Sequence, residues 1–168
     1  MFKVTLLGYI PVNGIPEPKK HCSATFLIEG ISRTCSHQIV RHRLASFSQE
    51  SQRYVSLEKG GWQAVIPPVI SANQQADEVL NTAWGDLQEA YSQLRTLRIR
   101  KEDARFLLPN AAETRLVMSM HYLALRHFLW LRIDKAAQWE VQEVAREVLR
   151  IIYPLAPDVF QDIWDAYM

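Results

Sequence analysis

The sequence predicts an α+β fold in which an antiparallel sheet packs with long helices in a single domain. Segments rich in β-branched and aromatic residues lie near the amino terminus, which favours strands there. Apolar residues recur at helical spacing through the second half of the chain. With 168 residues, of which 48% are hydrophobic and 22% charged, the chain has the usual size and composition of one globular domain.

The first thirty residues predict two strands joined by a loop. Phe2–Ile10 is rich in β-branched and aromatic residues and predicts the first strand. Val12–Lys20 combines an Asn-Gly pair with prolines and lysines, which is typical of a loop. Ser23–Ile28 predicts the second strand, and we expect it to end at the Glu29-Gly30 pair that follows.

The next segment predicts one short helix followed by irregular structure. Ser32 is a good N-cap residue for a helix that runs to about His42. Ser46–Gln52 has many hydroxyl groups and no apolar periodicity, so we expect a loop or an irregular turn. The Gly-Gly pair at 60–61 and the Pro-Pro pair at 67–68 bound a second irregular stretch.

Helical patterns fill the rest of the chain, because apolar residues recur there at steps of three and four. The third of these helices is apolar on nearly every side, which is typical of an element that is deeply buried or packed against a partner subunit. Asp134 is a good N-cap for the fourth. The predicted helices are Asn73–Leu97, Lys101–Leu108, Glu113–Leu131, one that begins after Asp134, and a last short one that ends at Tyr167.

Composition narrows the classes of protein. The net charge of +1 gives no long-range field to attract a polyanion, so a nucleic-acid partner is unfavoured, although a local basic patch is compatible with it. Cys22 and Cys35 show no disulfide-framework or zinc-site spacing. No apolar run approaches the roughly 20 residues of a membrane span, and the amino terminus does not resemble a secretory signal. We therefore expect a cytoplasmic protein without a membrane partner.

The densest group of polar residues lies between Arg41 and Arg53. It holds three guanidinium groups, the imidazole of His42 and three hydroxyl groups within thirteen residues. Arginine forks match phosphate oxygens, so the segment predicts a site for a phosphorylated small molecule. Gln38 shares the expected helical face with Arg41, where its amide suits a base or a ribose. The alternative is a solvated helix end, since cations near a carboxyl terminus favour the helix dipole.

A second group of polar residues lies later in the chain. Arg105 follows Glu102 by three residues, so we expect the two to pair on one helical face. Arg132 ends the predicted third helix on an apolar stripe with His121, where an arginine is costly unless it is paired, faces a ligand or reaches solvent. His121 and His127 are six residues apart and no zinc-binding motif is present, so we expect no metal site.

Taken together, these residues resemble the flavin-dependent thymidylate synthases. The family signature is R-H-R, then seven residues and a serine, with R-Y two residues on. It stands here as Arg41-His42-Arg43, LASFSQE, Ser51-Gln52 and Arg53-Tyr54. A second block that resembles the family comprises EDARFLLP at Glu102–Pro109, Thr114, HFLWLR at His127–Arg132 and AQWE at Ala137–Glu140.

The resemblance implies a homotetramer of α+β subunits whose active sites are each assembled from several chains. Such an enzyme binds FAD and dUMP, takes a methylene carbon from methylenetetrahydrofolate and uses NADPH to reduce the flavin. The product is dTMP, formed by reductive methylation of the uracil ring without a cysteine nucleophile. The sequence agrees with this chemistry, because neither Cys22 nor Cys35 has a nucleophile signature around it.

The resemblance also implies roles for individual residues. Arg132 would be catalytic by stabilising negative charge on the uracil ring, which makes the carbon that gains the methyl group more nucleophilic. Ser51 would be catalytic by orienting the nucleotide. The implied dUMP-binding residues are Gln38, Arg41, Gln49, Glu50, Ser51, Gln52, Arg53, Arg105 and Arg132. The implied FAD-binding residues are Arg41, His42, Arg43 and Gln49, with His121 and His127 from another subunit.

Two alternatives remain open. The usual asparagine and glutamate of the signature loop are Ser48 and Gln49 here, so the contacts to the flavin differ. These departures are compatible with a divergent relative that methylates another uracil nucleotide, such as UMP. The second alternative is a non-catalytic module that binds a nucleotide or RNA, which the near-neutral charge disfavours.

Overall fold

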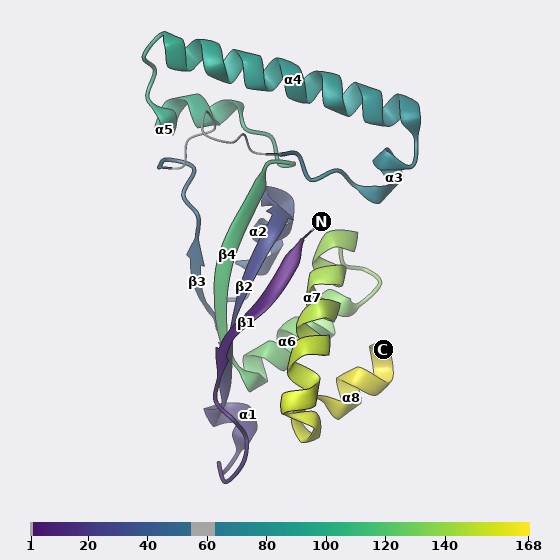
Figure 1. Ribbon diagram of the computed structural model, residues 1–168. Coiled ribbons are helices and arrows are strands. Elements are labelled where there is room, and N and C mark those ends of the chain that lie inside the picture. Colours follow the sequence, from purple (N-terminus) through teal and green to yellow (C-terminus); the bar gives the residue numbers. More distant parts are fainter. Residues whose placement is uncertain (1, 55–62) are drawn as a thin grey trace. The chain divides into compact units, whose positions relative to one another are not determined.

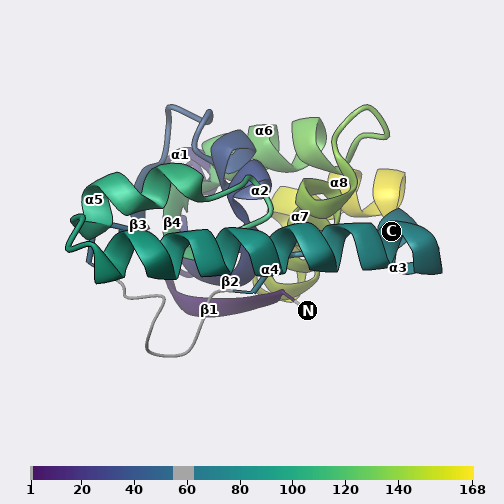
Figure 2. The same cartoon turned by 90° about the horizontal axis from the view of Figure 1, so that it is seen from above.

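The computed structural model describes residues 2–54 and 63–168, which divide into two compact units (Figures 1 and 2). The first unit combines the chain up to Gln49 with Thr114–Met168, and the second is Glu50–Glu113. Among the described residues, the first unit holds the sheet with five helices, and the second holds three helices with an isolated bridge between Ala64 and Ala112. The α+β class predicted from the sequence is confirmed.

A four-stranded antiparallel sheet forms the centre of the first unit, with the strand order β1-β2-β4-β3. β1 pairs with β2 so that Lys3 lies opposite Glu29, and β3 pairs with β4 so that Ser46 lies opposite Ser119. The predicted first strand and the start of the second are confirmed. The strands are β1 (Lys3–Tyr9), β2 (Ser23–Ser32), β3 (Ser46–Gln49) and β4 (Glu113–His121).

Three helices of the first unit, α6, α7 and α8, cover one face of this sheet (Figure 1). In Figure 1, α6, α7 and α8 lie together on one side of it, and α7 contacts both β1 and β2. Alternate side chains of the two central strands point into the core that results, including Phe26 of β2 and Met118 of β4. The helices are α1 (Pro18–His21), α2 (Arg33–Ile39), α6 (Tyr122–Ile133), α7 (Trp139–Ile152) and α8 (Pro157–Tyr167), with a 3₁₀ turn at Tyr153–Leu155.

The predicted helix Glu113–Leu131 is wrong in its first half. The segment Glu113–His121 is strand β4, and the helix begins only at Tyr122. The sequence ETRLVMSMH alternates polar and apolar residues, and the buried positions alternate in the same way. A period of two is the signature of a half-buried strand, whereas the run of apolar residues after it suggested a helix.

The predicted loop at Ser46–Gln52 is also wrong in part. Ser46–Gln49 forms strand β3 at the edge of the sheet, although its sequence is mostly polar. Its hydrogen bonds come from β4, which lies about 70 residues further along the chain. β2 likewise runs on through Glu29-Gly30 to Ser32, because Gly30 adopts a φ of 70° that a glycine takes without strain.

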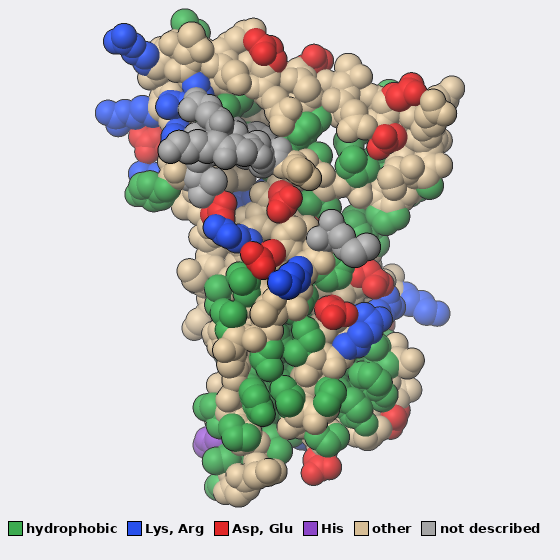
Figure 3. Space-filling model, viewed as in Figure 1, with side chains coloured by type: hydrophobic (Ala, Val, Ile, Leu, Met, Phe, Trp, Pro, Cys, Tyr) green, Lys and Arg blue, Asp and Glu red, His purple; other side chains and the backbone are tan. Residues whose placement is uncertain are grey.

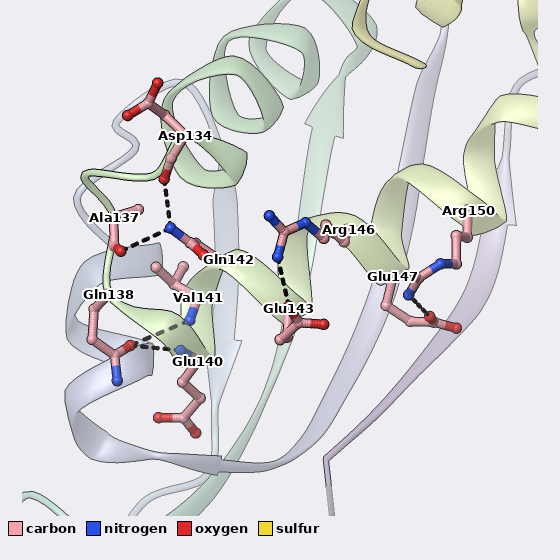
Figure 4. A network of polar contacts seen from close by, with 10 residues as sticks. All are labelled: Asp134, Ala137, Gln138, Glu140, Val141, Gln142, Glu143, Arg146, Glu147 and Arg150. Carbon is pink, nitrogen blue, oxygen red and sulfur yellow. Dashed lines mark hydrogen bonds and ion pairs between the residues drawn. The ribbon is translucent and has the colours of Figure 1, made fainter. Parts of the chain in front are cut away.

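The start of α7 differs from the prediction (Figure 4). Asp134 does not cap this helix. It ends α6, and its carboxylate accepts the backbone N–H of Ala136 at 2.8 Å. Gln138 caps α7, because its side-chain oxygen accepts the backbone N–H groups of Glu140 at 3.1 Å and Val141 at 3.3 Å.

The cap of α2 and the end of α8 agree better with the sequence. Ser32 caps α2 by accepting the backbone N–H of Cys35 at 3.0 Å, as predicted, and the helix ends at Ile39. The last helix begins at Pro157 and ends at Tyr167, which confirms that prediction. The predicted loop at Val12–Lys20 contains one short helical turn, because Pro18 opens α1.

The second unit is built around α4 (Gln74–Thr96), which confirms the long predicted helix. Asn73 caps it by accepting the backbone N–H of Ala76 at 3.1 Å. The short helix predicted at Lys101–Leu108 is present as α5 (Lys101–Ala104) and a 3₁₀ turn at Arg105–Leu107. The other elements are α3 (Pro68–Ser71) and a bridge between Ala64 and Ala112, while the predicted stretch at 60–61 lies outside the described residues.

Apolar side chains remain exposed in each unit. The face of the first unit seen in Figure 3 gathers hydrophobic side chains over β1 and α7, and Leu7 and Tyr9 of β1 are exposed. In the second unit, Val79 is 71% exposed and Phe106 is 85% exposed. Across the residues that the structure describes, no helix is both long and apolar enough to cross a membrane.

Candidate functional site

The end of α2 brings the Arg-His-Arg motif to one side of the first unit. α2 ends at Ile39, and the backbone N–H of His42 donates to the Ile39 oxygen at 3.2 Å. Exposure alternates along this turn: the His42 side chain is 8% exposed, whereas those of Arg41 and Arg43 are exposed. The motif therefore presents two cations outward and one imidazole inward.

These residues line a pocket of about 340 Å³ that lies within the first unit. Its polar wall combines the motif with two side chains of α6, His127 and Arg132. Its apolar wall is formed by Leu44, Ala124 and Leu131. Three guanidinium groups beside an apolar surface suit an anionic ligand that carries a flat apolar ring.

Arg132 lies in the last turn of α6 and is fixed by two hydrogen bonds. Its Nε donates to Nε2 of His42 at 2.9 Å, and its Nη2 donates to the backbone oxygen of Gln38 at 3.1 Å. Both acceptors are neutral groups, so the guanidinium keeps its full charge for the pocket that it lines. The sequence predicted that Arg132 must be paired, solvated or facing a ligand, and the structure gives it two partners and a pocket.

His42 is held as a neutral ring. Its ring packs edge-on against Phe128 with centroids 5.0 Å apart, and the ring of His127 lies 6.0 Å away. Burial, with smaller contributions from the nearby Arg132 and His127, lowers the pKa of His42 to about 4. At neutral pH the imidazole is therefore uncharged and has one nitrogen free to accept a hydrogen bond.

A buried carboxylate connects the start of α2 to the start of α7. The Glu140 side chain is 2% exposed, and its carboxylate accepts both the backbone N–H of Ser32, at 2.7 Å, and the Ser32 hydroxyl. Burial raises the pKa of Glu140, while the bonds from Ser32 act in the opposite direction. Ser32 is the cap of α2, so Glu140 helps to fix the helix whose end carries the Arg-His-Arg motif.

Two residues for which the resemblance implies a flavin contact form hydrogen bonds within the first unit. The amide of Gln49, at the end of β3, donates to the Ser36 hydroxyl at 3.0 Å and to the Thr114 hydroxyl at 3.2 Å. His121 caps α6, because its Nδ1 accepts the backbone N–H of Ala124 at 3.2 Å. The sequence suggested that His121 and Arg132 share one helical stripe, but His121 lies before the helix. It does not line the pocket described above.

The second unit carries the rest of the signature. Arg53 donates to the Glu102 carboxylate at 3.0 Å, and its guanidinium lies 5.7 Å from the ring centre of Tyr54. The Ser51 hydroxyl accepts the backbone N–H of Arg53 at 3.3 Å, which stabilises this turn. Glu50 and Gln52 are half-buried on either side of Ser51.

Glu102 and Arg105 interact as expected, but through the backbone of Glu102 and not through its carboxylate. Nε of Arg105 donates to the backbone oxygen of Glu102 at 3.1 Å, whereas the Glu102 carboxylate pairs with Arg53 and, at 3.5 Å, with Arg100. The side-chain hydrogen bond from Arg53 is the main reason that the pKa of Glu102 is lowered. A second pocket of about 340 Å³ lies within this unit and is lined by Arg53, Tyr54, Arg95, Arg100, Lys101 and Glu102.

Several residues of these sites were missed from the sequence. Ala124 and Leu131 share one face of α6 with His127, for which the resemblance already implied a role, but this face became evident only once the helix was known to begin at Tyr122. Glu140 could have been found, because it lies four residues before Val144 on the apolar face of α7. Among the described residues, no group of three or more His, Cys, Asp or Glu side chains is placed to hold a metal ion.

The fold and the pocket together describe an α+β protein with a cationic pocket at a helix end, and comparison with known proteins gives its family. The family model for the thymidylate synthase complementing protein matches residues 3–158, so the chain belongs to this family. The flavin-dependent thymidylate synthase of Geobacter sulfurreducens is 46% identical over 143 residues, which cover 85% of this chain and 62% of the relative. That of Pyrococcus abyssi is 40% identical over 149 residues, 88% of this chain and 59% of the relative.

The chain thus spans about three fifths of the length of the curated relatives it matches. Its fold is similar to a crystal structure of thymidylate synthase X from Helicobacter pylori with FAD and dUMP, with a TM-score of 0.76 at 20% sequence identity. The match covers 97% of this chain and 99% of that one. At this identity the likeness establishes the fold, and the chemistry has to be argued from the residues themselves.

Proposed function

We propose that this protein catalyses the FAD-dependent reductive methylation of dUMP to dTMP, with methylenetetrahydrofolate as carbon donor and NADPH as reductant. Family membership and the Arg41–Tyr54 signature support the proposal. The observation that carries it is the position of Arg132. A guanidinium held by two neutral acceptors at the wall of a pocket is a preorganised positive charge.

Arg132 would act on the uracil ring. Methylation requires negative charge to develop on the ring, so that the carbon that accepts the methylene group becomes nucleophilic. A cation that is already oriented stabilises this charge without reorganising during the reaction, and one such donor is typically worth about 100-fold to 1,000-fold in rate. Ser51 would orient the nucleotide at the same carbon.

The pocket of the first unit fits part of a flavin cofactor. Arg41 and Arg43 would hold its phosphates, and the apolar wall of Leu44, Ala124 and Leu131 would pack against a ring. Bound FAD, once reduced by NADPH, would supply the hydride that completes the methyl group. His127 would close the edge of this pocket, and burial of the apolar wall would exclude water from the reacting atoms.

Arg53 and Arg105 would bind the phosphate of the nucleotide. Arg53 is half-exposed and paired with Glu102, an arrangement that a phosphate can displace at small cost. Arg105 donates to the backbone oxygen of the same glutamate, and the turn at Ser51 offers a hydroxyl group. A dianionic phosphate competes well for such a pair, because it accepts two parallel bonds from one guanidinium.

The homotetramer with shared active sites, and its single-domain subunit, also belong to this proposal. The hydrophobic side chains gathered over β1 and α7 (Figure 3) support assembly, since exposed apolar patches usually mark interaction surfaces. Light scattering coupled to size-exclusion chromatography measures the assembly directly. A monomer at micromolar concentration, in the presence of FAD and dUMP, would contradict it.

The proposed reaction is tested by flavin content and by tritium release. The purified chain is expected to bind FAD with a yellow absorbance spectrum and to release tritium from dUMP labelled at carbon 5, in the presence of NADPH and methylenetetrahydrofolate. A folded protein that binds no FAD and releases no tritium would contradict the proposal. Stronger binding of UMP than of dUMP would favour the divergent relative, and polynucleotide affinity that falls steeply with salt would favour the non-catalytic module.

A further inference from the structure

Among the described residues, the guanidinium of Arg132 is hydrogen-bonded along one edge and has no partner along the other. Nε and Nη2 form the side-on edge of the planar group, and they are bound by His42 Nε2 and by the Gln38 backbone oxygen. Two bonds on one edge fix both the position and the plane of the group. A guanidinium carries five N–H donors, so three remain for the pocket that Arg132 lines, two on Nη1 and one on Nη2.

We propose that His42 is a positioning residue for Arg132, whose free edge it directs at the uracil ring of the nucleotide by accepting the Nε–H. This role rests on the proposed function. It is separate from the contact with the flavin that the family resemblance implies for the same histidine.

The chemistry of the contact assigns the tautomer of His42. An arginine N–H can only donate, so the Nε2 of His42 must be the nitrogen without a proton, and the proton of the neutral ring is on Nδ1. An imidazolium has no acceptor and would repel the guanidinium. A carboxylate in the same place would hold Arg132 but would cancel the charge that the reaction needs. A neutral imidazole avoids both effects.

The surroundings of His42 keep its ring in place and uncharged. Phe128 packs against the ring, and the backbone of His42 is tied to the end of α2. The charged or titratable groups that face it are Arg132 and His127 from α6, with Arg41 and Arg43 on either side along the chain. Each of them is a base, so none of them favours a proton on the imidazole.

These surroundings predict the pH range in which the contact persists. Burial lowers the pKa of His42 to about 4, so the ring stays neutral from neutral pH down to about 5. As the pH falls through the lowered pKa, protonation removes the acceptor and releases Arg132. An ordinary histidine would lose the contact near pH 6.5.

The tautomer can be measured without any activity assay. In protein labelled with ¹⁵N-histidine, the NMR signals of the ring nitrogens distinguish the two tautomers, and those of His42 are identified by their loss in His42→Gln. We expect an unprotonated Nε2 at pH 7 that does not titrate above about pH 5. Arg132→Ala should shift this signal, whereas Arg150→Ala, on the exposed face of α7, should leave it unchanged. A proton on Nε2, or titration near pH 6.5, would overturn the proposal.

Binding of dUMP provides the second measurement. His42→Gln keeps an acceptor oxygen near the place of Nε2, whereas His42→Phe keeps an aromatic ring against Phe128 and has no acceptor. Loss of a hydrogen bond to a charged group typically weakens an interaction by about 10-fold to 100-fold, so we expect that loss for His42→Phe. His42→Gln should stay within about threefold of the wild type, as should the control His37→Gln, an exposed histidine outside the pocket.

The outcomes separate this inference from the proposed function. Equal loss of dUMP affinity in His42→Gln and His42→Phe, or no loss of dUMP affinity in His42→Phe, would overturn the positioning role even if the enzyme is active. Thermal unfolding followed by circular dichroism identifies a variant that fails to fold, and the NMR measurement on the wild-type chain then decides the matter. Failure of the wild-type chain to bind dUMP would overturn the proposed function, whereas the wrong tautomer would overturn the role of His42 alone.

Discussion

Two arginines, one in each unit, are held in opposite ways. Arg132 of the first unit donates to an imidazole nitrogen and a backbone oxygen, both neutral, and is half-buried. Arg53 of the second unit donates to the Glu102 carboxylate, and the two side chains are 50% and 36% exposed. The first arrangement preserves the charge of the cation and fixes its direction. The second neutralises the cation in the absence of a ligand.

This difference in hydrogen-bond partners indicates which role each cation suits. An exposed ion pair contributes little to stability, because water screens it and its long side chains lose entropy when they pair. Such a pair opens easily when a better anion arrives, which suits the capture of a phosphate. A half-buried guanidinium bound to neutral acceptors does not rearrange. It suits the stabilisation of charge that appears only during the reaction.

The largest expected effect is on turnover, upon loss of Arg132. Arg132→Ala removes the preorganised charge, so we expect tritium release from labelled dUMP to fall by about 100-fold to 1,000-fold or more, while FAD remains bound. The flavin absorbance spectrum checks the second half of this statement. Arg150→Ala is the matched control, since Arg150 forms an exposed pair with Glu147 on α7. Turnover within threefold of the wild type would show that Arg132 is not the activating cation.

Loss of Arg53 should act on binding instead of turnover. Arg53→Ala is expected to weaken dUMP binding by about 2–4 kcal/mol, which is typical when one partner of a hydrogen-bonded charge pair is removed. Calorimetric titration of dUMP measures this, and titration of deoxyuridine, which lacks the phosphate, is the control. If both ligands lose the same affinity, Arg53 does not contact the phosphate.

A buried carboxylate in the first unit should matter for stability. Glu140→Ala would leave the N–H and hydroxyl donors of Ser32 buried without their acceptor, at a cost of about 2–3 kcal/mol in the free energy of unfolding. Urea denaturation gives this value. Glu147→Ala, which removes an exposed carboxylate from the same helix, should change it by less than about 0.5 kcal/mol. Equal costs for the two variants would argue against the role of Glu140 at the start of α2.

The smallest effect should come from Glu102. Glu102→Gln removes the carboxylate that pairs with Arg53 but keeps its shape, so the cation no longer has to leave a partner when a phosphate binds. We expect a gain in dUMP affinity of no more than about fivefold, largest at low salt. A loss of affinity would indicate that Glu102 itself contacts the nucleotide.

Much of the secondary structure could be predicted from local patterns. Helix α4 and the caps at Ser32 and Asn73 follow from residues that lie next to one another in the chain. The failures have a common cause. β3 is a strand only because β4 supplies its hydrogen bonds from a distant part of the sequence. β4 is strongly apolar, and its alternation was masked by the apolar helix that follows it.

For the site as well, local sequence patterns were predictable and long-range contacts were not. The residue types around Arg41–Arg53 and the family resemblance indicated which side chains carry the chemistry. Nothing in the local sequence placed His42 beside Arg132, which lies 90 residues further along the chain. Likewise, no local pattern showed that the amide of Gln49 donates to two hydroxyl groups or that Nδ1 of His121 accepts a backbone N–H at the start of α6.

The sequence by itself determined the α+β class, the family, the long helix and the set of cationic residues, because each depends on composition, short-range periodicity or a contiguous motif. Only the tertiary structure decided how the cations are held. Whether an arginine keeps its charge depends on which groups meet it across the core, and those groups come from strands and helices that are remote in sequence. For Arg132 these groups are a buried imidazole and a backbone oxygen, and for Arg53 the partner is an exposed carboxylate.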